Sequence, residues 1–577
     1  MSVQTVVLLT LVALAAIVAA RVVGGRTGLP SAVLLTVIGI GYALIPGPNI
    51  TLNPAVILTV VVPPLLYSTA LDSSLLAIRN NLRTVVSLSV VLVLVTAVLI
   101  GAGFAWFVPG ATLAAGIALG AAVAPPDPVA ALAVGRRVGL PVKLLNLIQG
   151  EGLLNDATAL TTLTVAVAAL KGDGFSAPSA IGKFLLASVG GVAAGVAIAY
   201  AVRLLRSFMR DPLVTNALSL ATPFAAYLLG EEVHVSGVLA VVVAGLIAGH
   251  QAPWTISGAG RLQTDAVWRL VDFLLEGFVF LLIGQQLPEV VRGLPTFGGG
   301  TIAVAVTITV GVVLLFRPLW LVLTQALPRS LHTRLGTDDT DTDGPDDSQD
   351  SDDDTDEDTD GERDAGQPAG RRTPRRGAQR LSGRELTVLS WAGTRGVISL
   401  AAIFSLPRTI DGEPFAVRDL LLFCTFVVVL VTLLGQGLTF APLVRRLGLR
   451  AGAADHARLR NQARSAAVQA ALERLGEIEA EGRPGVAGQI EALRVQLRGR
   501  LERYRGRLDL LQDPNLTEIP VSPRYEAALA VRRAVIEAQR QEMLRWRDAG
   551  QLPDEDLRIL ERELDHEERL LPDRPLH

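Results

Sequence analysis

The chain has 577 residues, of which 50% are hydrophobic and 19% are charged, so it exceeds the length of one ordinary domain. Its formal net charge of −3 averages unlike parts. Residues 1–335 and 386–447 are mostly apolar runs, whereas residues 337–364 and the tail after Arg450 are strongly polar. The average gives no indication of a nucleic-acid partner, and none is expected. A single cysteine, Cys424, excludes an intrachain disulfide.

The first apolar run is expected to be a retained membrane helix, because no basic residue precedes it, as one would in a signal peptide. A bilayer core about 30 Å thick is crossed by a helix of about 20 apolar residues. Such runs recur, and we predict thirteen membrane segments. They are Thr5–Val23, Ser31–Leu44, Pro54–Leu71, Thr84–Phe107, Leu113–Val134, Leu144–Leu170, Ile181–Val202, Leu213–Gly230, Val233–Gly249, Val267–Leu287, Thr301–Ala326, Leu386–Phe404 and Leu420–Leu443.

Basic residues between the segments indicate one orientation, because Arg and Lys concentrate in cytoplasmic loops. The second and fourth loops carry no charge, and the eighth carries only Glu231 and Glu232. The sixth and twelfth loops are mildly mixed. The odd-numbered loops, with the segment ends beside them, hold Arg21, Arg26, Arg79, Arg83, Arg136, Arg137, Lys143, Arg203, Arg206, Arg210, Arg261 and Arg269. This pattern predicts an N-terminus outside and a C-terminus in the cytoplasm.

Two parts of the chain are expected outside the membrane domain, which comprises residues 1–335 and 381–447. Residues 336–380 contain a dense Asp/Thr tract followed by arginines, which predicts a disordered acidic cytoplasmic loop. That loop is either a solvated insertion or an attractor of cations. Residues 448–577 are rich in Ala, Leu, Glu and Arg, which predicts a helical cytoplasmic tail that regulates, dimerises or caps.

The fifth segment is predicted to break inside the membrane. Its sequence Ala124-Pro125-Pro126-Asp127-Pro128 has three prolines within four residues, and a proline inside a helix costs about 3 kcal/mol. Asp127 before Pro128 fits an N-cap followed by proline at the first helical position. A second half-helix can therefore start with Asp127 at its positive end. Asp127 is then either a cap alone or a cap that also contributes to an ion site.

The twelfth segment predicts a second break, because Gly393 and Gly396 bracket Arg395 within an apolar run. Segments five and twelve are seven apart, an odd number, so they cross the membrane in opposite directions. Broken helices of opposite sense are typical of inverted-repeat transporters, which bind ions at mid-membrane. Arg395 is expected either to compensate the negative ends of the half-helices or to extend toward the membrane surface.

The sixth segment carries two carboxylates at membrane depth, where an ionised Asp or Glu costs roughly 2.5–3.5 kcal/mol. Glu151 and Asn155 share one helix face, whereas Gly152 and Asp156 share another, about 100° away. An unpaired Arg317 in the eleventh segment would also be costly, so we expect it to pair with Glu151. Asp156 then remains free to hold a proton or a cation.

Two further acids occur in the tenth segment. Asp272 and Glu276 are one turn apart, toward the predicted cytoplasmic end. They either line the entry to the ion site or pair with Arg269 or another arginine.

At these residues the chain resembles the monovalent cation/proton antiporter-1 family, the sodium/proton exchangers of bacteria and animals. The resemblance covers about residues 5 to 445, in the stretches Pro63-Pro64-Leu65-Leu66-Tyr67, Pro126-Asp127-Pro128, Gly150–Asp156, Arg317-Pro318 and Gly393-Thr394-Arg395-Gly396. It implies an all-α polytopic membrane protein with inverted repeats and two broken crossing helices, and a homodimer with a moving core. It assigns proton and Na⁺ binding to Asp156 with Asn155 and Asp127, and a structural salt bridge to Glu151 and Arg317.

Three positions depart from that family. It often has Thr where Pro126 stands, Ser where Gly152 stands and Glu where Ser68 stands, and these side chains supply sodium ligands in some members. Here a backbone carbonyl, water or Ser68 has to substitute. The preference between Na⁺ and K⁺ therefore stays open.

We expect a secondary antiporter of the plasma membrane that exchanges Na⁺ for H⁺ in pH and sodium homeostasis, without a cofactor. A K⁺/H⁺ antiporter of the same fold is the alternative. Exchange should be electroneutral, because Asn155 cannot take up a proton, Glu151 is held by Arg317 and Asp127 acts as a cap. Two other classes are alternatives: a membrane metalloprotease, disfavoured because the His-Glu-x-x-His pattern is absent, and a sensor whose tail signals while its membrane part only binds ions.

Overall fold

The computed structural model describes residues 2–45, 53–171, 177–209, 211–326, 381–410, 413–449, 453–481, 487–511 and 523–569. The chain divides into two compact units, Met1–Leu449 and Arg450–His577. The acidic loop predicted at residues 336–380 lies outside the described residues.

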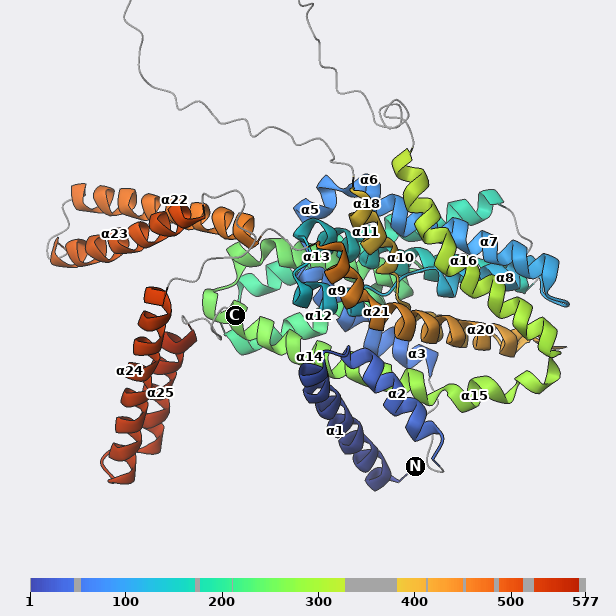
Figure 1. The fold of residues 1–577 in the computed structure, drawn as a ribbon, viewed down its shortest axis with the longest axis horizontal. Helices are drawn as coiled ribbons and strands as arrows, with labels where there is room; N and C mark the ends of the chain where they lie inside the picture. Colours follow the sequence, from blue (N-terminus) through green and yellow to red (C-terminus); the bar gives the residue numbers. More distant parts are fainter. Residues whose placement is uncertain are drawn as a thin grey trace, which may run out of the picture. The chain divides into compact units, whose positions relative to one another are not determined.

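The described part of the first unit is helical except for a small antiparallel sheet, which the sequence did not indicate (Figure 1). Its strands are β1 Thr409–Ile410 and β2 Glu413–Pro414, with Thr409 opposite Pro414. The α-helices are α1 Val3–Thr27, α2 Ser31–Ala43, α3 Pro54–Val56, α4 Val62–Leu71, α5 Leu75–Asn80, α6 Leu82–Val86, α7 Leu92–Phe107, α8 Leu113–Val123, α9 Pro128–Val138, α10 Val142–Leu170, α11 Ala177–Ser207, α12 Pro212–Glu232, α13 Gly237–Thr255, α14 Gly258–Gln285, α15 Leu287–Arg292, α16 Gly299–Ala326, α18 Gly383–Trp391, α19 Val397–Phe404, α20 Arg418–Leu430 and α21 Gly437–Leu447. Short π-helical stretches, η1 Ile57–Val61, η2 Ser87–Val91 and η4 Val431–Gln436, continue neighbouring helices, and η3 Leu294–Thr296 is a 3-10 turn.

Each predicted membrane segment coincides with a helix or with a helix that has a short break. In the described part of the chain, 10 helices are long and apolar enough to cross a membrane. The apolar helix α2 is shorter, α14 carries several charged residues in its first half, and α18 and α19 are each only half of an interrupted segment.

Glycine lets neighbouring helices approach closely. Gly39 of α2 faces Gly284 of α14, and a Cβ at either position would overlap backbone atoms of the other helix. Gly101 of α7 and Gly116 of α8 form the same kind of contact. In lipid, no hydrophobic force drives helices together, so their association depends on van der Waals packing. Small residues allow that packing because they let the two backbones approach closely.

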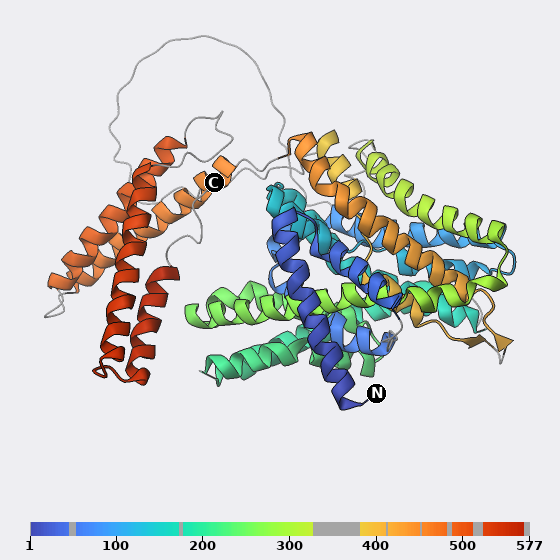
Figure 2. The same ribbon diagram turned by 60° about the horizontal axis from the view of Figure 1, so that its bottom comes forward.

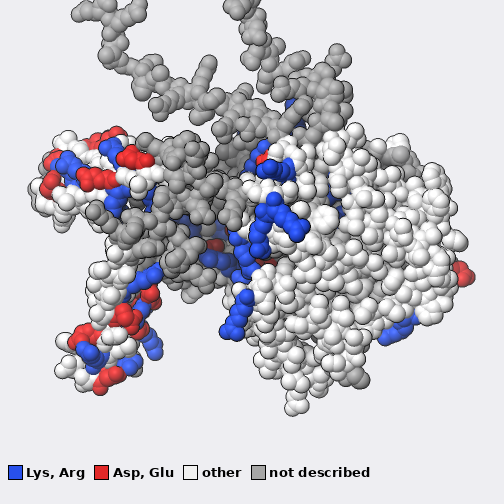
Figure 3. Space-filling view, in the orientation of Figure 1, with Lys and Arg blue, Asp and Glu red and all other residues white. Residues whose placement is uncertain are grey.

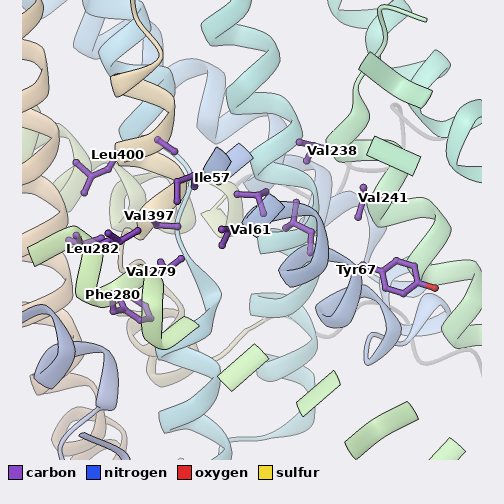
Figure 4. Packing of buried hydrophobic residues seen from close by; sticks show 14 of the residues in the cluster. Ile57, Val61, Tyr67, Val238, Val241, Val279, Phe280, Leu282, Val397 and Leu400 are labelled. Atoms are coloured by element: carbon purple, nitrogen blue, oxygen red, sulfur yellow. The ribbon is translucent and has the colours of Figure 1, made fainter. Parts of the chain in front are cut away.

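Two groups of helices pack mainly among themselves, and α10 and α19 contact both. The first group contains α1, α2, α4 and α11 to α14, and the second contains α7 to α9, α16, α20 and α21. Buried apolar residues fill the space between the groups, and Figure 4 shows Val397 and Leu400 of α19 beside Ile57 and Val61 of η1 and Val279 of α14. The broken helices are therefore set in an apolar interior.

The second unit contains two helical pairs, α22 Ala453–Ala480 with α23 Ala487–Leu510 and α24 Pro523–Asp548 with α25 Asp554–Arg569 (Figures 1 and 2). Arg540 of α24 bonds Asp565 and Glu568 of α25, each at 2.9 Å. Charged side chains gather on these helices, whereas most of the visible described surface of the first unit carries none (Figure 3). That contrast fits a membrane unit and a water-exposed tail.

Candidate ion-binding site

The fifth segment breaks between Val123, where α8 ends, and Pro128, where α9 begins. Asp127 has an extended backbone, and its Oδ1 accepts a hydrogen bond of 3.0 Å from the N–H of Val129. Its carboxylate therefore caps the positive end of α9 within the membrane segment.

The twelfth segment breaks between Trp391 and Val397, and the two breaks contact each other. The N–H of Asp127 donates to the Thr394 carbonyl at 2.6 Å, and the Thr394 hydroxyl donates to the Asp127 carbonyl at 2.9 Å. Gly396 lies directly against the Asp127 carboxylate, where a Cβ would overlap it. These bonds satisfy backbone groups that have no water partner in a bilayer, and they fix Asp127 relative to α19.

Arg395 is 2% exposed, and its guanidinium donates to three carbonyls around the crossing. Nε bonds Val123 at 3.0 Å, Nη2 bonds Ala124 at 3.2 Å, and Nη1 bonds Gly393. Its own N–H donates to the hydroxyl of Thr432 in η4 at 3.0 Å. Because the acceptors lie at the carboxyl ends of α8 and α18, the cation sits where the half-helix dipoles are negative.

Glu151 of α10 and Arg317 of α16 form a buried ion pair, with exposed side-chain fractions of 1% and 4%. Nη1 contacts Oε1, and Nη2 donates to Oε2 at 2.9 Å. Nε and Nη2 also donate to the Leu389 carbonyl, at 3.2 and 3.0 Å. The carboxylate and the guanidinium therefore form a bidentate pair, and the Leu389 carbonyl accepts two further hydrogen bonds from Arg317.

Asn155 and Asp156 lie beside the crossing. Nδ2 of Asn155 donates to the Pro126 carbonyl at 2.8 Å, while its fully buried Oδ1 has no hydrogen-bond partner within the described ranges. Asp156 is 6% exposed, and its charge interacts with that of Asp127. Among the described residues, nothing bonds the Asp156 carboxylate. Two carboxylates and one amide oxygen therefore remain available to a cation.

The suggested extra ligands differ in position. The Pro126 carbonyl already accepts from Asn155. Gly152 packs against the ring of Pro128, so a side chain at position 152 would collide with it. Ser68 donates its hydroxyl proton to the Leu65 carbonyl at 3.0 Å. It lines a cavity of about 220 Å³ whose walls include none of the site residues on α9 and α10.

The two acids of the tenth segment face different cavities. Asp272 shares the Ser68 cavity, whereas Glu276 lines one of about 80 Å³ together with Arg21 and Arg137. Arg269 bonds Asp265, one turn before it on the same helix. Glu276 therefore lies in a cavity between α9 and the first helix group, beside two arginines, a position compatible with the ion entry and with pairing to an arginine alike.

Two groups that hold the site together were not identified from the sequence. Thr394 lies inside the break between Gly393 and Gly396, and that position is the sequence signal for its role. Thr432 lies in an apolar run 37 residues after Arg395, and nothing in the sequence marks it as a partner.

Two interrupted helices whose breaks contact each other, with a buried carboxylate that nothing in the described part of the chain bonds, are typical of membrane proteins that transport small cations. Residues 10–446 match the sodium/hydrogen exchanger transmembrane family, so the chain belongs to that family of cation/proton antiporters, which are transporters and not enzymes.

Individual antiporters and exchangers are also similar to this chain over most of its length. The chain is 31% identical over 579 residues to an uncharacterised Na⁺/H⁺ exchanger of Mycobacterium tuberculosis, covering 98% of this chain and 96% of that one. It is 30% identical to the Na⁺/H⁺ antiporter ApNhaP of Aphanothece halophytica, over 78% of this chain and 74% of the relative. A Bacillus subtilis antiporter named for sodium, potassium, lithium and rubidium is 27% identical over 70% of this chain and 56% of its own.

Solved structures support the fold. The sodium/proton antiporter MjNhaP1 of Methanocaldococcus jannaschii superposes with a TM-score of 0.56 at 15% identity, covering 78% of this chain and 99% of MjNhaP1. At this identity the similarity shows the fold alone. Apart from its two short strands, the described part of the chain is thus a helical, multi-pass membrane antiporter.

Proposed function

We propose that the protein exchanges Na⁺ for H⁺ and that Asp156 binds the two in alternation. The observation that carries the proposal is that Asp156 is buried without a bonded partner among the described residues, whereas Glu151 is paired with Arg317. A bare carboxylate inside a membrane is costly, so it should hold either a proton or a cation. The free Oδ1 of Asn155 and the carboxylate of Asp127 supply further oxygen ligands.

The exchange is electroneutral, with one cation for one proton. Asn155 is an amide and cannot take up a proton, and Glu151 stays charged against Arg317. Asp127 keeps its charge as the cap of α9. Asp156 alone alternates between binding a proton and binding a cation, so the site carries the same charge in the proton-bound and the cation-bound state.

The surrounding architecture follows from the same proposal. The thirteen segments all cross the plasma membrane, with the N-terminus outside and the tail in the cytoplasm, and segments five and twelve belong to inverted repeats. The membrane domain comprises residues 1–335 and 381–447, and two copies form a homodimer.

The residues that hold the site, on α8 to α10, α16, α18 and α19, form the core that moves against the first helix group. The apolar contacts between these two parts support this, because such contacts can slide without leaving polar groups unpaired.

The test is exchange in proteoliposomes under an imposed membrane potential. Purified protein is reconstituted with internal K⁺ and valinomycin, and Na⁺-driven proton movement is followed with a pH-sensitive dye. We expect the exchange rate to be unaffected by the potential. If the potential alone drives Na⁺ uphill, a second group titrates, and Asp127 is the first residue to examine.

A K⁺/H⁺ exchanger is the second candidate. It is favoured by the Bacillus subtilis relative, which is named for four monovalent cations, and by Gly152, which contributes no side-chain ligand to select for size. Competition among Na⁺, K⁺ and Li⁺ in the same vesicles separates the two. Na⁺ as the most effective competitor supports the first candidate, and K⁺ supports the second.

A further inference from the structure

An apolar groove is lined by helices of the first helix group. It has a volume of about 640 Å³ and lies between α1, α2 and α14. In Figure 1, α1 and α2 diverge from the connection between them, and the groove residues of α1 and α2 belong to the diverging parts. The volume falls within the range of roughly 300–1,000 Å³ for ligand pockets.

The groove lies at one end of the membrane segments. Its residues on α1 run from Val6 to Ile17, those on α2 are Ile38 and Tyr42, and those on α14 end at Gln285, the last residue of that helix. Gln285 is nine residues beyond Glu276, about 13 Å along the helix. This end of the groove is therefore near the membrane surface, in the outer leaflet for the orientation proposed above.

One polar group in the groove lacks a partner. Gln285 is 7% exposed, and among the residues that the structure describes no donor bonds its side-chain carbonyl Oε1. The hydroxyl of Thr10, also in the wall, donates to the Val6 carbonyl at 2.9 Å. A buried acceptor without a donor costs roughly 1–3 kcal/mol. A molecule that brings a donor to this position removes that cost.

The lining indicates the chemistry of that molecule. None of the described residues that line the groove is charged, so they offer no counterion to a lipid with a net negative charge. The apolar length suits an acyl chain, and the polar end requires an N–H or O–H donor. A zwitterionic lipid with an ammonium head meets both conditions.

We propose that this groove binds phosphatidylethanolamine, with an acyl chain along α1 and α14 and the ammonium donating to Oε1 of Gln285. Phosphatidylcholine has the same net charge and can have the same chains, but its quaternary nitrogen has no N–H. The site therefore prefers ethanolamine to choline, and the hydrogen bond sets that preference.

The test is native mass spectrometry of the delipidated full-length protein with phosphatidylethanolamine, phosphatidylcholine or phosphatidylglycerol of identical chains. The wild type should retain the ethanolamine lipid about tenfold better than the choline lipid, the magnitude of one charge-assisted hydrogen bond. In Gln285→Leu the two lipids should bind equally. In Gln436→Leu, which removes another buried glutamine carbonyl without a partner but lies outside the groove, the preference should persist.

Other outcomes overturn the proposal. Equal retention of the ethanolamine and choline lipids by the wild type excludes the hydrogen bond, and this comparison does not depend on whether a variant folds. A preference that survives in Gln285→Leu places the lipid elsewhere. Stronger retention of phosphatidylglycerol excludes the ethanolamine assignment. Because binding is measured without transport, a failed exchange assay does not affect the result.

Discussion

Removing one partner of the Glu151–Arg317 pair is expected to destabilise the membrane unit. In Glu151→Gln, the two terminal nitrogens of Arg317 lose a charged bidentate acceptor, and the neutral amide oxygen and the Leu389 carbonyl that remain do not balance the guanidinium charge. In Arg317→Gln, the Glu151 carboxylate loses the side chain that bonds both of its oxygens. Breaking a buried pair costs about 3–5 kcal/mol, because the remaining charge is uncompensated.

The double variant Glu151→Gln/Arg317→Gln should be less destabilised than the sum of the single variants. Two neutral amides can bond each other, and neither leaves a charge stranded. The coupling in this double-mutant cycle should exceed about 1 kcal/mol, since residues in direct contact are not additive.

The assay measures unfolding of the purified protein in detergent in two ways, by denaturant titration and by the apparent melting temperature. Asp265→Asn is a matched control, because it breaks an Arg–Asp pair whose side chains are 73% and 48% exposed. Exposed pairs contribute about 0–1 kcal/mol, so this variant should unfold almost as the wild type does. Unchanged stability in both single variants, or an additive cycle, would refute the structural role of the pair.

Three further outcomes are expected. Asp156→Asn should abolish exchange while the protein stays folded and inserted, as judged by size-exclusion chromatography, and wild-type rates in that variant would move the site to Asp127. Gly396→Ala should lower both exchange and stability, because its Cβ overlaps the Asp127 carboxylate, whereas Gly435→Ala, which meets nothing within 4 Å, should behave as wild type in the same assays. Deleting Asp338–Asp360, a tract without apolar residues, should leave exchange and its ion preference intact, and a large shift in apparent cation affinity would show that the tract concentrates ions.

The helices and the breaks could be predicted because their causes are local. Apolar runs predicted the helices, of which 10 in the described part of the chain are long and apolar enough to cross a membrane, and the prolines around Asp127 and the glycines around Arg395 interrupt their helices directly. The capping of α9 by Asp127 also follows from adjacent residues. Arg317 could be named as the partner of Glu151 because a membrane leaves few alternatives for a buried charge.

The contacts that assemble the site were decided by tertiary structure. Thr432 accepts the Arg395 N–H, and the Leu389 carbonyl accepts from Arg317, although no pattern in the sequence connects these residues. Ser68 faces a cavity with Asp272, and Gly152 packs against Pro128. Each of these contacts depends on the rotation and the depth at which two helices that are distant in the sequence pack together. Composition and spacing fix which residues enter the membrane, but packing alone fixes which of them face one another.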